Sequence, residues 1–255
     1  MLVPTLWNLV WVIMEINKHI IIWLFLLLLF GCESAPLTNG KKVRQTIAVA
    51  HFSKVAIFDV FNVYLIRDSR SEIILEGGAN LLSSVLISCV NDSLSVKSCL
   101  RAKWLRKYER IHVYLKTDTF KVIEMHMPCY VQSVNTLRGK QILLWSVSKL
   151  QEADITVDCD LLALKSSHTA VGEITLRGKC RFADIWVYNA CKVQASKLDC
   201  RYAKIRNEGI ADVHIAVDTA LQAYLLHNGN IYYSGNPNIE IVENSGQGKL
   251  YHEEK

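Results

Sequence analysis

The sequence predicts an all-β fold and, within that class, a right-handed parallel β-helix or β-solenoid. The first observation is that apolar and polar residues alternate with period 2 from residue 51 onward. The second is that no segment after Cys32 keeps helical apolar spacing for three turns. The third is a pattern that recurs in the second half of the chain. Of the 255 residues, 51% are hydrophobic and 21% are charged, which excludes a disordered chain, a collagen and a coiled coil.

An apolar run near the N-terminus predicts export. Residues 20–30 are all apolar, and Lys18 lies just before them. A membrane-spanning helix needs about twenty such residues, so the run fits the hydrophobic region of a signal peptide. The following Gly31-Cys32 resembles the cleavage site of a bacterial lipoprotein. We therefore expect residues 1–31 to be a lipoprotein signal peptide and the thiol of Cys32 to carry the lipid that anchors the chain to a membrane.

The true start of this signal peptide is expected at Met14, because residues 14–18 are typical of the beginning of a signal peptide. The alternative is that residues 1–30 form an uncleaved membrane anchor. Glu15, Asn17 and Lys18 would then lie in the middle of the anchor, where polar and charged groups are costly, so the lipoprotein interpretation is favoured.

Two further segments follow the signal peptide. Residues 32–44 have no hydrophobic pattern and are expected to be a tether. Residues 45–255 are expected to form one solenoid domain. The alternating segments between residues 51 and 118 do not repeat, so we expect them to cap the solenoid or to form an abutting sheet, because an open sheet edge invites aggregation.

The repeat itself is the motif Ala-Asp-(Ile/Val)-x-(Val/Ile). Its copies begin at Ala153, Ala183 and Ala211, 30 and 28 residues apart. Two more short alternating segments follow each copy, so the sequence predicts turns of 28–30 residues with three short strands each. Equivalent strands of successive turns would pair in parallel, about 4.8 Å apart. The alternative, a Greek-key sandwich, alternates similarly but does not explain a repeat of this length.

The motif places one aspartate in each copy, at Asp154, Asp184 and Asp212. In turns of 28–30 residues these side chains would form an outward ladder. Carboxylates in register repel one another, so a ladder indicates a bound cation or the acidic cleft of a polysaccharide-cleaving β-helix enzyme. The alternative is that each aspartate accepts hydrogen bonds from local backbone N–H groups. The alternative is favoured, because the oxygen spacing of a calcium loop is absent from the sequence.

The eight cysteines give no metal-site spacing. Cys129, Cys159 and Cys191 are 30 and 32 residues apart and are expected to form a linear column at a corner, which does not offer the tetrahedral convergence that zinc needs. Cys180 and Cys200 are expected to lie on different faces and to remain unpaired. Two other cysteines could bridge a hairpin; they are Cys89 and Cys99.

Two groups of side chains are candidates for surface binding. Aromatic rings stack on sugar faces, and basic residues attract anionic lipids and glycans; the alternatives are ordinary strand residues and a solvated loop. The basic group surrounds Trp104 and includes Arg106 and Lys107. The aromatic group consists of Tyr232 and Tyr233, with Trp186, Tyr188 and Tyr224.

No catalytic or cofactor motif is present in the sequence: it contains no nucleophile elbow, phosphate-binding loop, dinucleotide fingerprint or paired metal-binding histidines. The net charge is +5, but the basic residues are scattered, which argues against nucleic-acid binding. We expect no catalytic residue, no bound metal and no cofactor.

The C-terminal segments resemble a known family. Residues 228–237 read Asn-Gly-Asn-Ile-Tyr-Tyr-Ser-Gly-Asn-Pro, and residues 245–250 read Ser-Gly-Gln-Gly-Lys-Leu. With the opening segments 52–57, 60–65 and 75–81, they resemble the head GIN domain family of auto-transporter adhesins over about residues 50–250. The resemblance implies a repetitive all-β body, secretion or lipid anchoring, and no catalytic residues. The chain departs from the family pattern in having fewer glycines and more cysteines and tryptophans.

The function expected from these observations is that of a non-catalytic lipoprotein of the cell envelope. Its adhesin-like domain is expected to bind a glycan or an envelope or surface protein. It would be exported and held at the outer membrane, on its periplasmic or its surface side. The alternatives are a polysaccharide-active β-helix enzyme that uses the aspartates, and a periplasmic partner or sensor in envelope-stress regulation.

Overall fold

The structure, a computed structural model, describes residues 38–100 and 109–254. The chain divides into two units, residues 1–38 and 39–255, and the second contains every strand described below. Among the described residues, no helix combines the length and the apolar character needed to cross a membrane.

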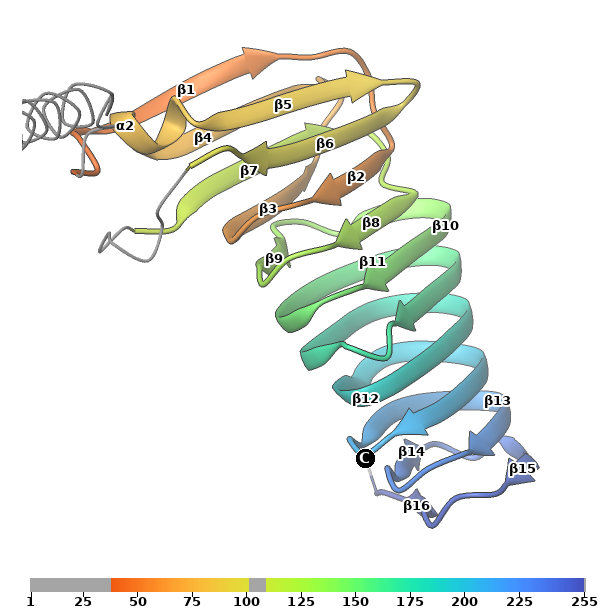
Figure 1. Cartoon of the computed structure of the whole chain (residues 1–255). Coiled ribbons are helices and arrows are strands. Elements are labelled where there is room, and N and C mark those ends of the chain that lie inside the picture. The colour runs from red at the N-terminus through yellow and green to blue at the C-terminus, as the bar shows by residue number, and fades with distance from the viewer. Residues whose placement is uncertain (1–37, 101–108, 255) are drawn as a thin grey trace, which may run out of the picture. The chain divides into compact units, whose positions relative to one another are not determined.

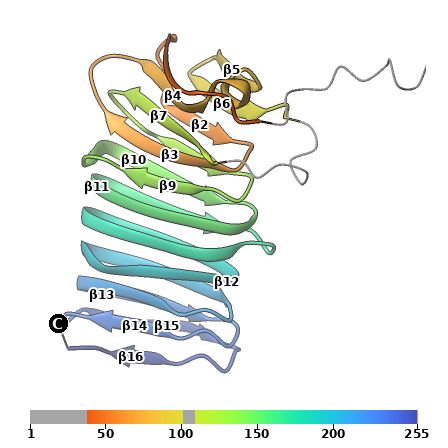
Figure 2. The same ribbon diagram turned by 90° about the vertical axis from the view of Figure 1, so that its left-hand side faces the viewer.

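The N-terminal part of the second unit is a sheet with antiparallel pairs. β1 pairs antiparallel with β4, β4 with β7, and β5 with β6, whereas β3 and β2 pair in parallel with the strands that follow (Figure 2). These strands complete the N-terminal end of the solenoid, as expected. β1 begins within the segment predicted as a tether. The elements are β1 (Lys42–Ala48), β2 (Lys54–Ile57), β3 (Phe61–Arg67), β4 (Glu72–Gly78), α2 (Ala79–Leu82), β5 (Val85–Val90), β6 (Ser93–Ser98) and β7 (Ile111–Thr117).

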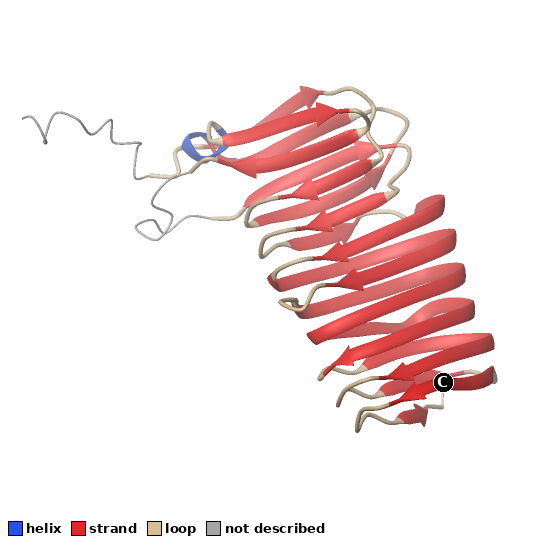
Figure 3. Ribbon diagram, turned by 45° about the vertical axis from the view of Figure 1, so that its right-hand side comes forward, coloured by secondary structure: helices blue, strands red, loops and turns tan. Residues whose placement is uncertain are grey.

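From residue 122 onward the chain winds as a solenoid of about 6 turns (Figure 1, Figure 3). All strand pairs between turns are parallel in this part. The all-β solenoid prediction is therefore confirmed. The strands are β8 (Val122–Met125), β9 (Tyr130–Ser133), β10 (Leu137–Ser146), β11 (Lys149–Ser166), β12 (Val171–Gly209), β13 (Val213–Leu225), β14 (Ile231–Ser234), β15 (Asn238–Asn244) and β16 (Leu250–His252).

Each turn has two long sides. Face A starts with β2 and β8, continues through segments of β10, β11, β12 and β13, and ends at β15. Face B starts with β3 and β9, continues through other segments of β11, β12 and β13, and ends at β14 and β16. Long strands such as β11 and β12 run through a corner and contribute to both faces.

The core lies between the two faces, where inward side chains stack in columns. Period-2 alternation sends every second residue inward on either face. On face A the registers join Ile123, Leu144, Leu164 and Ile185, and all four side chains are fully buried. The stacking of β-branched and leucine side chains from turn to turn holds the solenoid together by burial of apolar surface.

The predicted turn length is wrong. Paired residues of neighbouring turns are 17 to 22 positions apart, as for Leu137 with Val157 and Val213 with Ile231. The sequence spacing of 28–30 residues corresponds to about one and a half turns. Ala153 therefore lies on face B and Ala183 on face A, where it pairs with Leu162.

Candidate binding surface

An outward column of aromatic and charged side chains crosses face A from turn to turn. The registers join Glu124 to Trp145, Trp145 to Lys165 and Lys165 to Trp186. Further along the same face, Arg206 is joined to Tyr224. These residues alternate with the buried core residues of the same strands, so their side chains point to solvent. We call the set from Trp145 to Tyr224 the face A column.

Arg206 connects the two aromatic residues at the C-terminal end of this column. Its guanidinium carbon lies 5.2 Å from the centre of the Trp186 ring and 5.4 Å from the centre of the Tyr224 ring. A guanidinium at this distance from an aromatic face is attracted by the ring quadrupole. Arg206 also pairs with Asp184 at 3.2 Å, and the Trp186 Nε1–H donates a hydrogen bond of 2.8 Å to Glu208. The rings are therefore fixed in orientation before any ligand binds.

At the N-terminal end of the column, Trp145 has 41% of its surface exposed and is more accessible than Trp186, the other tryptophan among the described residues. Its ring centre lies 6.4 Å from that of His126, whose ring stacks on Phe58 at 4.4 Å. The Nε2 of His126 lies 2.9 Å from a Glu124 carboxylate oxygen. These contacts extend the aromatic surface toward β2.

Two more rings widen the surface beside Trp186. The ring of Tyr188 lies 5.6 Å from that of Trp186 and 4.0 Å from that of His168. Desolvation raises the pKa of the Tyr188 hydroxyl above its usual value, and the Glu208 carboxylate raises it further. Tyr188 therefore stays neutral over the physiological range and offers a hydroxyl that can donate and accept hydrogen bonds.

The predicted aspartate ladder is not formed. Asp154 lies on face B and pairs with Arg177 of the next turn, and Asp184 lies on face A and pairs with Arg206. Asp212 accepts a hydrogen bond of 2.9 Å from the backbone N–H of Asn230, which is the local role expected of a corner aspartate. The three carboxylates do not converge, because their spacing of one and a half turns moves successive copies to opposite faces.

The predicted aromatic group is divided between the two faces. Tyr232 lies on face B, where its ring stacks between those of His214 at 4.6 Å and Tyr251 at 5.1 Å. Tyr233 packs partly against the core and lies beside His252 at 5.0 Å. The rings on face A are those of Trp186, Tyr188 and Tyr224; Trp145 was not among the residues predicted from the sequence.

The cysteine predictions are also corrected. Cys180 and Cys200, which were expected on different faces, line the same cavity. Cys159 lies at the opposite corner of the turn from Cys129 and Cys191, so these three do not form a column. Cys89 pairs with Leu94 near one end of the β5–β6 hairpin and Cys99 lies beyond the other end, too far apart to be bridged. Within residues 38–100 and 109–254, no three His, Cys, Asp or Glu side chains are grouped so that they could hold a metal ion.

Four predicted site residues lie outside the described residues. They are Cys32, Trp104, Arg106 and Lys107.

The surface also has a basic hollow of about 510 Å³ near the N-terminal end of face A. Lys54, Lys121 and Lys140 surround it, and Val122 and Leu143 contribute apolar floor. An apolar floor with a cationic rim suits an amphiphile that carries negative charge.

The fold and the face A column together define a class: a β-solenoid that presents a flat array of outward side chains. A family model described as "Putative auto-transporter adhesin, head GIN domain" matches residues 51–237. The chain belongs to this family. In the sequence comparison, no curated protein matches the chain.

Solved structures share the fold at low sequence identity. A putative adhesin from Bacteroides fragilis is 19% identical, with a TM-score of 0.77, and the match covers 84% of this chain and 97% of that one. A putative adhesin from Parabacteroides distasonis is 16% identical, with a TM-score of 0.57 and coverage of 84% and 98%. A putative lipid binding protein from Parabacteroides distasonis is 13% identical, also with a TM-score of 0.57 and coverage of 84% and 98%.

Proposed function

We propose that this chain is an exported, lipid-anchored adhesin-like protein that binds a polysaccharide through the face A column and catalyses no reaction. Export and anchoring rest on the signal-peptide pattern of residues 1–31 and on Cys32. Family membership supports the adhesin-like role. The name of the Bacteroides fragilis structure, a putative adhesin, agrees with it.

The observation that carries the proposal is the face A column. Trp145, Trp186 and Tyr224 present aromatic rings on one face of a stack of turns, with Lys165 and Arg206 between them. Aromatic faces bind the C–H faces of sugars, and the charged groups between them can hydrogen-bond sugar hydroxyls or carboxylates. A polymer has repeated units, so it can contact several turns at once and gain affinity by multivalency.

An enzyme that uses the three aspartates is not supported by the geometry. A glycosidase needs two carboxylates that flank one bond. Asp154 and Asp184 are each paired with an arginine and lie on opposite faces, and Asp212 is held by the backbone of Asn230. The role of a periplasmic partner or sensor stays an alternative, and pull-down from envelope extracts is the measurement that would support it.

The test is binding of the purified chain to a panel of soluble and insoluble bacterial and host polysaccharides. We expect Trp145→Ala and Trp186→Ala each to weaken binding about five-fold, since one stacked ring contributes about 1 kcal/mol. Tyr251→Ala is the matched control, because Tyr251 is a similarly exposed aromatic residue at the end of face B. Equal loss in all three variants, or no binding by the unmodified chain, would contradict the proposal.

A second candidate is binding of an anionic lipid in the hollow lined by Lys54, Lys121 and Lys140. The cationic rim and apolar floor of this hollow favour lipid binding, and one structure with the same fold is named a putative lipid binding protein. Displacement of a fluorescent fatty acid would measure it. Lys140→Glu should lower the affinity, whereas Lys192→Glu, on the other face, should leave it unchanged.

A further inference from the structure

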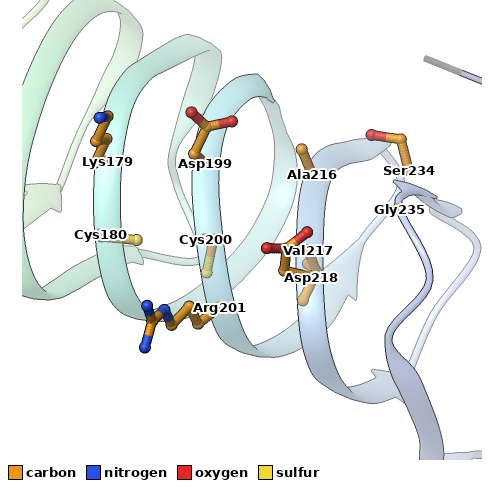
Figure 4. Close-up of a pocket in the computed structure, with 10 residues that line it drawn as sticks. All are labelled: Lys179, Cys180, Asp199, Cys200, Arg201, Ala216, Val217, Asp218, Ser234 and Gly235. Atoms are coloured by element: carbon orange, nitrogen blue, oxygen red, sulfur yellow. The ribbon is translucent and has the colours of Figure 1, made fainter.

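A corner of the solenoid brings cysteines of successive turns together. Cys159 pairs in register with Cys180, and Cys180 is followed one turn later by Cys200. The thiols of Cys180 and Cys200 are within hydrogen-bonding contact, and Figure 4 shows both sulfur atoms at the same corner. All three cysteines are free and buried. Paired residues of adjacent strands have the Cα separation that a disulfide requires.

Cys180 and Cys200 also line a cavity of about 380 Å³, whereas Cys159 does not (Figure 4). Lys179 and Arg201 lie beside the two cysteines, and Asp199 and Asp218 complete the polar rim. A small thiol reagent can therefore approach this pair from solvent. Oxidised glutathione carries carboxylates that the two basic side chains can attract.

The two thiols differ in acidity. Hydrogen bonding between the two thiols lowers the pKa of Cys200 below its ordinary value. The same contact and burial raise the pKa of Cys180. Burial raises the pKa of Cys159 to about 12, so Cys159 is a poor nucleophile near neutral pH.

We propose that Cys180 and Cys200 form a thiol–disulfide site, which a disulfide oxidant such as oxidised glutathione converts into a bond that joins two successive turns. This inference does not depend on the proposed function. Cys200 is the attacking group and Cys180 the resolving group.

The reaction balances in two steps. The Cys200 thiolate attacks one sulfur of the oxidant, a mixed disulfide forms, and the released thiolate takes a proton from water. The Cys180 sulfur then attacks the Cys200 sulfur, loses its proton, and displaces the second thiol of the oxidant. The protein gives up two electrons and two protons, and the oxidant takes them up and is reduced to two thiols.

The test is peptide mapping of the purified full chain after treatment with oxidised glutathione and alkylation of the remaining thiols. We expect a linked Cys180–Cys200 peptide in the unmodified chain. Cys180→Ser should trap glutathione on Cys200, because the resolving thiol is missing. Cys200→Ser should leave Cys180 without glutathione and without a link.

Cys191→Ser is the matched control, since Cys191 is equally buried at the opposite corner and should not affect the link. Modification of the exposed Cys99 shows that the oxidant has acted. If Cys99 is modified and the unmodified chain forms no Cys180–Cys200 link, or forms a Cys159–Cys180 link in its place, the proposal is overturned. This comparison needs no variant, so it stands even where a serine variant does not fold.

Discussion

At the scale of single residues, Arg206 performs two structural tasks in the face A column. Its guanidinium lies between the rings of Trp186 and Tyr224 and also pairs with Asp184, with only 22% of the side chain exposed. A partly buried cation with two ring contacts contributes more to the free energy of unfolding than an exposed ion pair does, because water screens its interactions less.

We expect Arg206→Ala to lower the free energy of unfolding by about 1 to 2 kcal/mol, through the loss of both ring contacts and the ion pair. Arg138→Ala is the control: the ion pair of Arg138 with Asp158 is exposed, with 61% of the arginine side chain accessible, and its loss should cost less than about 0.5 kcal/mol. Urea unfolding of both variants measures the difference. Equal effects would show that the ring contacts contribute nothing.

At the scale of the element, glycines allow the strands to bend at the corner between face B and face A. Gly178 has φ +99°, and a Cβ atom at this position would lie 2.1 Å from the carbonyl oxygen of Val157 in the preceding turn. Only glycine adopts this conformation without strain, and no side chain fits against that carbonyl. Gly139 lies at an equivalent corner two turns earlier, and a Cβ atom there would come no closer than 3.8 Å to another atom, the carbonyl oxygen of Gln141, which is an ordinary van der Waals contact.

These two glycines give a matched pair of substitutions. Gly178→Ala should destabilise the protein by more than about 2 kcal/mol, because strain at positive φ and a clash with backbone act together. Gly139→Ala should be neutral or slightly stabilising, because alanine lowers the entropy of the unfolded chain. Thermal unfolding distinguishes them, and a neutral Gly178→Ala would mean that the corner can relax.

The same scale explains what the sequence could and could not predict. The alternation identified strands and the repeated motif identified a solenoid, because stacked turns need equivalent inward residues. The predicted turn length was wrong because both faces carry the same pattern, in which a small residue points inward and the charged residue next to it points outward. Ala153-Asp154 on face B and Ala183-Asp184 on face A therefore look like copies one turn apart, although one and a half turns separate them.

The error in turn length also hid the candidate site. Trp145, Lys165 and Trp186 are different residue types, so they form a visible column only when the spacing of 20 or 21 residues is known. The same spacing places Cys200 one turn after Cys180. A shorter similarity in the sequence, between residues 180–185 and 200–205, carries this true period, and it could have indicated both features.

At the scale of the whole solenoid, its two described ends differ. The N-terminal end is closed by the antiparallel strands β1, β4, β5, β6 and β7. At the C-terminal end, β15 pairs only with β13 and β16 only with β14 among the described residues, and β15 is exposed along its whole length. In a stacked array each turn is stabilised mainly by its neighbours, so a terminal turn with one neighbour is less stable than a central one.

This asymmetry predicts a gradient of amide hydrogen exchange. Amides of β15 and β16 should exchange at least ten-fold faster than those of β11 and β12, since local opening of the last turn breaks one interface and opening of a central turn breaks two. The strands β3 and β7 should remain protected, because both pair on two sides. Ile241 in the last turn is half-exposed, so Ile241→Lys should barely change global stability. Ile205 is fully buried and lies at least one turn away from the end of the solenoid, so Ile205→Lys should prevent folding. Uniform protection from β3 to β16 would instead mean that the solenoid opens only as a single cooperative unit and that the last turn is stabilised as strongly as the first.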